Sequence, residues 1–421
     1  MTTSPRSSLL FEYRLLAAAL FPLVAVHAAW LGRRHRDGRF VRERLGFPAT
    51  RAAHDPVWVH AASVGEVNAA LPLIAEIHRR HPRTPVLLTT ATPTGGALAR
   101  RHVRDGLTHA YLPFDRTGAV RRFLAAYRPR AGIVVETELW PNLYAACAEA
   151  GVPLVIVNGR VSPRTLRAPV WLRDLYARCL AGVKAVLARS PEDRDGFLAL
   201  GAPPAAVHVL GNLKFAAPAR AAATPIALGR PYVLAASTRE GEEVKVVEAW
   251  RQSGSAHLLV VAPRHPKRLH EVLADLKPFG LSVAVRSRGD AISEHTRVYV
   301  ADTFGELEGF MAGAELVYMG GSLVPKGGHN VLEPARLGRA VVFGPHMDNF
   351  TEEARLLLQE DAAVQVHDTA ALAACFRELL DQPARRVTLG ERARAAVAAR
   401  SDVATRYADA IDGLIPDLQN T

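Results

Sequence analysis

The sequence predicts an α/β protein built from two doubly wound domains, and three observations support this expectation. Short apolar runs alternate with longer amphipathic stretches over most of the chain. At 421 residues the chain is too long for one ordinary hydrophobic core and suits two. The alternation breaks once, at residues 216–231, where proline, glycine and alanine replace the periodic apolar spacing. We therefore expect two parallel sheets, each covered by helices on both faces.

An uncharged apolar segment, residues 15–31, stands near the start of the chain and is followed by a basic cluster at residues 33–36. Its length is at the short end of what crosses a bilayer. A spanning helix and an interfacial helix whose basic flank binds lipid phosphates both stay open, because Pro22 and His27 weaken a full crossing. An apolar helix packed on the first domain fits the basic flank less well. The sequence thus predicts a membrane anchor, with the rest of the chain in the cytoplasm.

The first alternating region predicts buried strands, each followed by a helical pattern. Its strand-like runs are VWVHAAS, VLLTTAT, GIVVETE, PLVIVNG and AVLARS. After the interruption the alternation resumes with YVLAAST, HLLVVAPRH, RVYVADT, ELVYMGGS and AVVFGP. Ligands of such sheets bind beyond the carboxyl ends of the strands, so the residues that close each strand are the functional candidates. Two facing domains would place a reaction in the cleft between them.

Composition narrows the class of partner. Apolar residues make up 49 % of the chain, which argues against extensive disorder. Lysine and arginine outnumber aspartate and glutamate by 52 to 41, but no recognition motif for nucleic acid accompanies the scattered basic residues. Anionic lipid or phosphate is the better partner, and a merely solvated basic surface is the alternative. Three widely separated cysteines suit a reducing compartment and provide no metal-ligand spacing.

A glycine-rich segment in the second half, MGGSLVPKGGHNVLEPARLG, leads into a helix expected to begin near Asn330. Glycines let a backbone approach phosphate closely, and the N–H groups of a helix N-terminus attract anions. The segment is neither a P-loop nor a dinucleotide fingerprint, so ATPase and dehydrogenase functions lose their main support. Glu333 is placed to bind ribose hydroxyls, or else only favours the helix N-terminus. Arg264, at a strand end, is placed to bind phosphate, and a surface ion pair is its alternative.

Acidic residues close two strands of the first half. Glu66 follows VWVHAAS at the start of the next helix, where a carboxylate either caps the helix or serves as a general base. Glu136 and Glu138 close GIVVETE beside an apolar run, where acidic side chains are costly unless they are paired or used. Two acidic strand ends that face one cleft suggest acid-base chemistry.

Six segments occur in one order and spacing and together resemble a known family. They are HAASVGE, ETELWPNL, GNLKF, APRHP, DTFGEL and GGHNVLEP. In these segments the chain resembles the 3-deoxy-D-manno-octulosonic acid (Kdo) transferases of lipopolysaccharide and lipid A biosynthesis, over essentially its whole length. The resemblance implies a GT-B glycosyltransferase fold, in which two Rossmann-like domains face a central cleft and an apolar anchor helix precedes them.

Four regions follow from this resemblance and from the composition. Residues 1–46 are expected to form the membrane anchor and basic segment, and residues 47–215 the acceptor-binding domain. Residues 216–231 are the expected linker, and residues 232–421 the domain that binds the nucleotide sugar.

Roles are carried over by position in the matching segments. The family's proton acceptor falls on Glu66, and its two transition-state stabilisers fall on Glu136 and Lys214; a solvated lysine beside the linker is the alternative for Lys214. The contacts to CMP-Kdo fall on Pro263, Arg264, Phe304, Gly305, Glu306, Asn330, Val331, Leu332 and Glu333.

The resemblance further implies an inverting transfer of Kdo from CMP-Kdo to a glucosamine hydroxyl of lipid IVA, a tetraacyl lipid A precursor. No metal or other cofactor is expected, and the enzyme is expected at the inner membrane with its catalytic domains facing the cytoplasm. One rival interpretation is another membrane-associated nucleotide-sugar transferase or an epimerase of the same fold, since fold does not fix function. Another is a non-catalytic nucleotide-binding or lipid-binding membrane protein, which would not need Glu66, Glu136 and Lys214 together.

Overall fold

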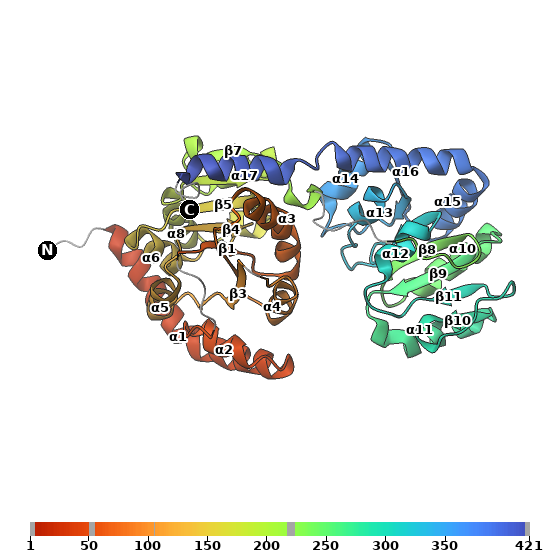
Figure 1. Cartoon of the computed structure of the whole chain (residues 1–421), viewed down its shortest axis with the longest axis horizontal. Helices are drawn as coiled ribbons and strands as arrows, with labels where there is room; N and C mark the ends of the chain where they lie inside the picture. The colour runs from red at the N-terminus through yellow and green to blue at the C-terminus, as the bar shows by residue number, and fades with distance from the viewer. Residues whose placement is uncertain (1–4, 50–54, 105, 217–223, 417–421) are drawn as a thin grey trace. The chain divides into compact units, whose positions relative to one another are not determined.

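The chain forms two compact units in a computed structural model that describes residues 5–49, 55–104, 106–216 and 224–416. One unit comprises Met1–Ala219 and Ser401–Thr421, and the other comprises Arg220–Arg400. Each unit holds one seven-stranded, wholly parallel sheet covered by helices (Figure 1). The predicted α/β class with two doubly wound domains is therefore confirmed. Of the predicted linker, residues 217–223 lie outside the described part of the chain.

Sheet A, in the first unit, has the strand order β3-β2-β1-β4-β5-β6-β7. Its strands are β1 (Val57–His60), β2 (Val86–Thr90), β3 (Leu107–Tyr111), β4 (Ala131–Val135), β5 (Leu154–Gly159), β6 (Ala185–Ala188) and β7 (Val207–Val209). The interior strands are continuous buried apolar runs, as a sheet covered on both faces requires.

The helices of the first unit connect these strands and flank them. They are α1 (Pro5–Arg34), α2 (Gly38–Arg44), α3 (Val64–Arg80), α4 (Pro93–Arg100), α5 (Thr117–Tyr127), α6 (Pro141–Glu149), α7 (Pro163–Leu166), α8 (Val170–Ala181), α9 (Pro191–Ala199) and α17 (Val403–Leu414). Figure 1 shows α3 and α4 on one side of sheet A and α5 and α6 on the other.

Sheet B, in the second unit, has the strand order β10-β11-β9-β8-β12-β13-β14. Its strands are β8 (Tyr232–Thr238), β9 (Leu258–Pro263), β10 (Val283–Val285), β11 (Val298–Val300), β12 (Leu316–Met319), β13 (Ala340–Phe343) and β14 (Ala363–Gln365). Its helices are α10 (Glu242–Ser253), α11 (Leu269–Leu276), α12 (Leu307–Gly313), α13 (Leu332–Arg336), α14 (Thr351–Gln359), α15 (Thr369–Asp381) and α16 (Pro383–Ala398).

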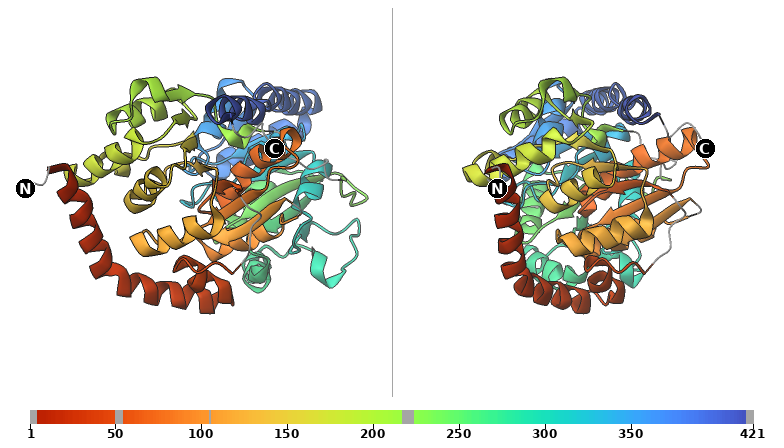
Figure 2. Two further views of the ribbon diagram at one scale, coloured as in Figure 1. Left: turned by 60° about the vertical axis from the view of Figure 1, so that its left-hand side comes forward. Right: turned by 90° about the vertical axis from the view of Figure 1, so that its left-hand side faces the viewer.

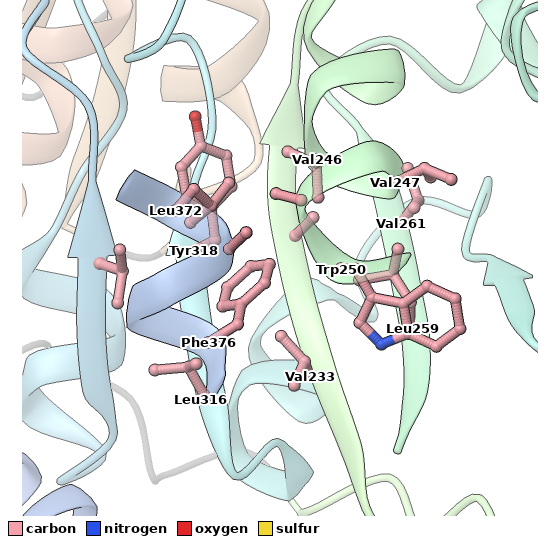
Figure 3. Close-up of a cluster of buried hydrophobic side chains, with 14 of the residues drawn as sticks. Val233, Val246, Val247, Trp250, Leu259, Val261, Leu316, Tyr318, Leu372 and Phe376 are labelled. Atoms are coloured by element: carbon pink, nitrogen blue, oxygen red, sulfur yellow. The ribbon is translucent and has the colours of Figure 1, made fainter. Parts of the chain in front are cut away.

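The core of the second unit lies between sheet B and the helices α10 and α15. Trp250 of α10 and Phe376 of α15 are fully buried in one cluster with Val233 of β8 and Leu316 of β12 (Figure 3). Burial of large apolar side chains on one face of the sheet is the dominant favourable term for such a layer. This packing holds β8 and β12 rigidly, and the loops after these two strands carry much of the candidate site.

The end of the chain corrects one predicted boundary. Residues 232–421 were expected to form the second domain, whereas Ser401–Thr421 belong to the first unit. Helix α17 packs on α3, and its Tyr407 hydroxyl accepts a hydrogen bond from Asn158 N at 3.2 Å and lies 2.8 Å from Gly211 O. Arg80 of α3 pairs with Asp412 at 2.9 Å. The chain returns because α17 buries its apolar face on α3, a contact that no local sequence pattern announces.

Helix α1 packs along the first unit on one side and exposes apolar side chains on the other. It contacts α2, α6 and α8, and Figure 2 shows it in dark red running along the outside of the unit. Tyr13 donates a hydrogen bond to Asp115 at 2.8 Å, Phe21 packs edge-on against Phe114, and Ala28 is buried. Residues Leu9–Arg34 are long and apolar enough to cross a membrane, with a mean hydropathy of 1.9 and only 11 % of their most apolar window buried.

Candidate functional site

The strand order of sheet A brings the two acidic strand ends together. Strand β1 pairs with both β2 and β4, so the chain runs outward from β1 to β3 and then returns to β4. Between β1 and β4 the following helices leave toward opposite faces, which opens the position where ligands of such sheets bind. Glu66 lies in the first turn of the helix after β1, and Glu136 follows β4 directly.

The Glu66 carboxylate bonds to the backbone at the start of α3 and also has a raised pKa. Its carboxylate accepts hydrogen bonds from Ala62 N at 2.7 Å and from the Ser63 hydroxyl at 2.8 Å, while Ser63 caps α3. Burial raises the pKa of Glu66, the charge of Glu136 raises it further, and the result is about 7 despite these two hydrogen bonds. The two alternatives from the sequence are thus compatible, because a capping carboxylate with a pKa near neutrality can also act as a base.

Glu136 is held in a strained backbone conformation. Its φ of 61° lies in the left-handed region, which costs a non-glycine residue on the order of 1–3 kcal/mol. The Glu136 N–H donates to Val157 O at 2.9 Å, which fixes the residue at the end of β4 beside β5. Strain at a half-buried carboxylate next to a second carboxylate is typical of a position kept for function.

A third carboxylate and a buried histidine complete this edge. Glu138 accepts a hydrogen bond from Trp140 Nε1 at 2.7 Å, and its carboxylate lies 3.9 Å from Nε2 of His60, the last residue of β1. Burial would raise the pKa of Glu138, but His60, Trp140 and the charge of Arg44 together hold it below its ordinary value. Glu138 is therefore charged at neutral pH. The sequence pattern indicated Glu138 but not His60, because in the sequence His60 looks like any other residue of a buried strand.

Lys214 lies on a short 3₁₀ turn, η2 (Leu213–Phe215), which packs against α3, the helix that carries Glu66. Asn212 Oδ1 accepts from Lys214 N at 3.0 Å, and Asn158 Oδ1 accepts from Leu213 N at 2.9 Å. These contacts anchor the turn to β5, whereas the Lys214 side chain is only half-buried. The three predicted catalytic residues therefore come from neighbouring elements of one unit.

In the second unit the corresponding reversal lies between β8 and β12, which pair with each other. The buried Glu242, at the start of α10, accepts hydrogen bonds from Gly321 N at 2.6 Å and from Ser322 N and Leu323 N at 3.0 Å each. It also accepts from the Tyr318 hydroxyl at 2.6 Å. Glu242 thus fixes the glycine-rich turn after β12. The sequence does not indicate this role, because an acidic residue in the first turn of a helix ordinarily only favours the helix dipole.

Positive charge gathers at the carboxyl ends of β8 and β9. Arg264, just after β9, is exposed, and its N–H donates to Thr238 O at 3.0 Å. Nη1 of Arg239, just after β8, lies 2.8 Å from His265 Nε2. Burial and then the charges of Arg264 and Arg239 lower the pKa of His329 in the glycine-rich segment to about 4. Such a cluster suits an anionic phosphate. Arg239 and His329 were not predicted, although both follow a strand end or a glycine pair.

Three of the other residues predicted to contact CMP-Kdo form the turn between β11 and α12. Phe304 is 78 % exposed, Gly305 has a φ of +86°, and Glu306 accepts from Arg286 Nη2 at 2.7 Å and from the Thr303 hydroxyl. The Arg286 hydrogen bond is the main cause that lowers the pKa of Glu306. Pro263 is the buried last residue of β9, the strand that pairs with β11.

The helix expected to begin near Asn330 begins at Leu332 instead. Asn330 Oδ1 accepts from Leu332 N at 3.1 Å, immediately before α13, whose N-cap residue is Val331. Its Nδ2 donates to the exposed Glu333 carboxylate at 3.1 Å, whereas Val331 and Leu332 are buried. Val331 and Leu332 therefore present backbone rather than side chains to any ligand, and only Asn330 and Glu333 offer polar side chains.

Candidate metal ligands are sparse in the described ranges, where no group of three or more His, Cys, Asp and Glu side chains is placed to hold an ion.

Comparison with known proteins shows which proteins this chain is similar to. Residues 39–217 match the model of a family described as 3-deoxy-D-manno-octulosonic-acid transferase (kdotransferase). The chain is 38 % identical to the 3-deoxy-D-manno-octulosonic acid transferase of Bordetella pertussis, over 95 % of this chain and 98 % of that protein. It is 31 % identical to the enzyme of the same name from Haemophilus influenzae, over 90 % of this chain and 92 % of the relative.

Among solved structures, a glycosyltransferase from Rickettsia africae is similar in fold. The two chains share 12 % identity with a TM-score of 0.60, and the similarity covers 86 % of this chain and 99 % of that one. At that identity the likeness concerns the fold alone.

Proposed function

The chain belongs to the family of 3-deoxy-D-manno-octulosonic acid (Kdo) transferases, and from that premise we propose that it transfers Kdo from CMP-Kdo to a glucosamine hydroxyl of lipid IVA. It is a glycosyltransferase of lipopolysaccharide biosynthesis. The observation that carries the proposed chemistry is the pair Glu66 and Glu136 at adjacent strand ends, with the pKa of Glu66 raised to about 7.

The proposed reaction is a single displacement. Glu66 removes the proton of the acceptor hydroxyl as its oxygen attacks the anomeric carbon of Kdo. The bond between that carbon and the phosphate oxygen breaks, and CMP leaves with the electron pair, so the anomeric configuration inverts. A base with a pKa near neutrality is half deprotonated at neutral pH and keeps useful basicity. Glu136 and Lys214 stabilise charge in the transition state from the neighbouring elements.

The donor is proposed to bind the second unit. The positive groups Arg239 and Arg264 lie at the carboxyl end of sheet B and offset the negative charge that develops on the departing phosphate, beside His329, which is neutral at pH 7. Glu333 is proposed to accept hydrogen bonds from the ribose hydroxyls, because it is exposed and Asn330 orients its carboxylate. These roles agree with the position of the glycine-rich turn, which Glu242 fixes.

The protein is proposed to reside at the cytoplasmic face of the inner membrane through α1. Because α1 packs along the first unit through Tyr13, Phe21 and Ala28, it is better suited to lie in the membrane interface than to cross the bilayer. Its outer face exposes Leu15, Leu20, Leu23 and Val26 to the lipid.

A transfer assay tests the proposal. Purified full-length protein is mixed with radiolabelled CMP-Kdo and lipid IVA, and the lipid product is separated by thin-layer chromatography. We expect label to move to the lipid in step with the release of CMP. Release of CMP without labelled lipid, or isomerisation of the sugar without transfer, would overturn the proposed acceptor.

A further inference from the structure

The first unit contains a pocket of about 290 Å³ between α1, α2 and the start of α5, apart from the candidate catalytic carboxylates. Four arginines from three helices and a loop line it, namely Arg14, Arg44, Arg116 and Arg122. Ala17 and Phe21 of α1 form an apolar wall. A basic pocket with one wall formed by an apolar surface helix suits a ligand that is anionic at one end and apolar at the other.

Aromatic rings hold three of the guanidinium groups in place. Arg44 lies over Phe114 with its Cζ 4.2 Å from the ring centroid, and Arg116 lies over Phe21 at 4.1 Å. Arg122 lies over Phe47 at 4.4 Å and donates to Leu45 O at 2.6 Å. Stacking fixes each guanidinium plane while its edge N–H groups stay available to an anion. The pocket is therefore ordered before any ligand binds.

Among the described residues, none of the four arginines forms an ion pair with a carboxylate, although the charge of Glu138 acts on Arg44. The nearby Asp115 accepts instead from Asn142 N at 3.0 Å, Leu143 N at 2.8 Å and the Tyr13 hydroxyl at 2.8 Å, so its carboxylate caps α6. Arg14 donates to the neutral amide oxygen of Asn142 at 2.8 Å.

Arg44 carries an unsatisfied buried donor. Its Nη1 donates to Leu112 O at 2.7 Å, but its buried Nε finds no hydrogen-bond partner among the residues that the structure describes. Burial lowers the pKa of Arg44 to about 10, although the charge of Glu138 opposes this shift. A buried guanidinium donor without an acceptor is costly, and a bound anion would remove that cost. The N-terminus of α5 adds to the positive potential, because the N-cap residue of this eleven-residue helix, Arg116, provides no side-chain hydrogen bond to it.

We propose that this pocket binds the phosphate monoester head group of a membrane lipid. A phosphate monoester carries about −1.5 to −2 charges at pH 7 and offers three acceptor oxygens, which match several fixed guanidinium groups. The exposed Val24 lies one helical turn after Phe21, and the exposed Leu20 lies one turn before Val24, so acyl chains have an apolar path away from the pocket. The lipid would thereby fix the rotational setting of α1 at the membrane surface, beyond what apolar insertion alone determines. This inference rests on the proposed attachment of α1 to the membrane.

Vesicle flotation of the full-length protein tests the pocket. Three vesicles are compared: phosphatidylcholine alone, and phosphatidylcholine with either phosphatidic acid, a monoester, or phosphatidylglycerol, a diester, adjusted to equal surface potential. We expect the wild type to prefer the phosphatidic acid vesicles by about ten-fold. The variant R116Q/R122Q removes two exposed pocket arginines and should lose this preference. The matched control R33Q/R34Q removes two exposed charges outside the pocket and should bind both anionic vesicles less while keeping the preference.

Several outcomes would overturn the assignment. A wild type without preference for the monoester, or a preference that R116Q/R122Q retains, would show that only surface charge acts. Loss of the preference when inorganic phosphate matches the concentration of lipid phosphate would show a site for free phosphate instead of lipid. If the wild type does not bind vesicles made of phosphatidylcholine alone, the attachment of α1 to the membrane is refuted, and the lipid site with it. The transfer assay with lipid IVA in detergent tests the proposed reaction independently of that result. Thermal melts and CMP binding check that each variant is folded.

Discussion

The carboxyl groups of Glu66 and Glu136 follow adjacent parallel strands, and the charge of Glu136 adds to the effect of burial in raising the pKa of Glu66 to about 7. The register of β1 and β4 produces this coupling, because both strands end at the same edge of sheet A. An acid whose pKa is raised by burial and by a neighbouring carboxylate is typical of sites for proton transfer.

Glu66→Gln should lower the rate of Kdo transfer by a factor of about 10² to 10⁴, because the amide cannot accept the hydroxyl proton. The affinity for CMP-Kdo should change little, since the residues proposed to bind CMP-Kdo lie in the other unit. Transfer rates and calorimetric CMP-Kdo titrations measure both. Glu76→Gln, on the same helix but paired with Arg79 and Arg80, is the matched control and should keep full activity. A Glu66→Gln enzyme with the wild-type rate would refute the assignment.

The raised pKa of Glu66 also predicts that the free energy of unfolding depends on pH. The Glu66 carboxyl has an ordinary pKa of 4.5 and titrates at about 7 in the folded protein, so between these values the folded state binds more protons than the unfolded state. Its contribution to the free energy of unfolding therefore falls as pH rises from about 4.5 to 7 and stays low above that. Glu66→Gln should exceed the wild type in stability by about 1–3 kcal/mol at pH 8 and by little at pH 5. Urea unfolding at the two pH values measures the difference. An equal difference at both would contradict the raised pKa.

Arg264→Gln should weaken CMP binding about ten-fold, because it removes a guanidinium from the positive cluster around His329. The turnover of saturated enzyme should fall as well if Arg264 also stabilises the departing phosphate. Calorimetry with CMP and steady-state kinetics separate these effects. Lys267→Gln, an exposed charge change three residues away, is the control. If both variants bind CMP alike, Arg264 contributes only general positive charge.

The sequence predicted ten of the strands, and the four that it missed are the edges of the two sheets. Strands β3 and β7 border sheet A, and β10 and β14 border sheet B. Interior strands are buried on both faces and so read as continuous apolar runs, whereas edge strands such as β7, with an exposed His208, carry no such run. The missed return of α17 has a similar cause, because its partner α3 lies more than 300 residues earlier in the chain.

Site residues that close strands were visible in the sequence, and those that act through long-range contacts were not. Glu66, Glu136 and Arg264 follow apolar runs, so the general rule for parallel sheets selects them. Arg239, His329 and Glu242 gain their roles only when β8 and β12 pair, an adjacency that crosses more than 70 residues. The pocket arginines Arg116 and Arg122 likewise look like ordinary helix-surface charges until α1 and α2 cover them.

Excess EDTA should leave the transfer rate unchanged. The expectation follows from the cationic side chains Arg239 and Arg264, which we propose to offset the phosphate charge that a metal ion would otherwise offset. Rates are compared before and after chelation and dialysis. Inactivation that added magnesium reverses would overturn this view and would make a metal part of the donor complex.

Leu23→Gln/Val26→Gln should weaken binding to phosphatidylcholine vesicles at least about ten-fold without lowering the melting temperature, because both side chains are 71 % exposed and only a membrane would bury them. Deleting residues 1–32 is a less decisive test, since it also removes the Tyr13 hydrogen bond to Asp115 and the buried Ala28. Val387→Gln, an exposed apolar residue of the second unit, is the control and should not alter vesicle binding. Transfer to acceptor in vesicles should fall more than transfer to acceptor in detergent, because α1 raises the enzyme's local concentration at the lipid surface. If the double variant still binds vesicles like the wild type, another surface of the chain anchors it.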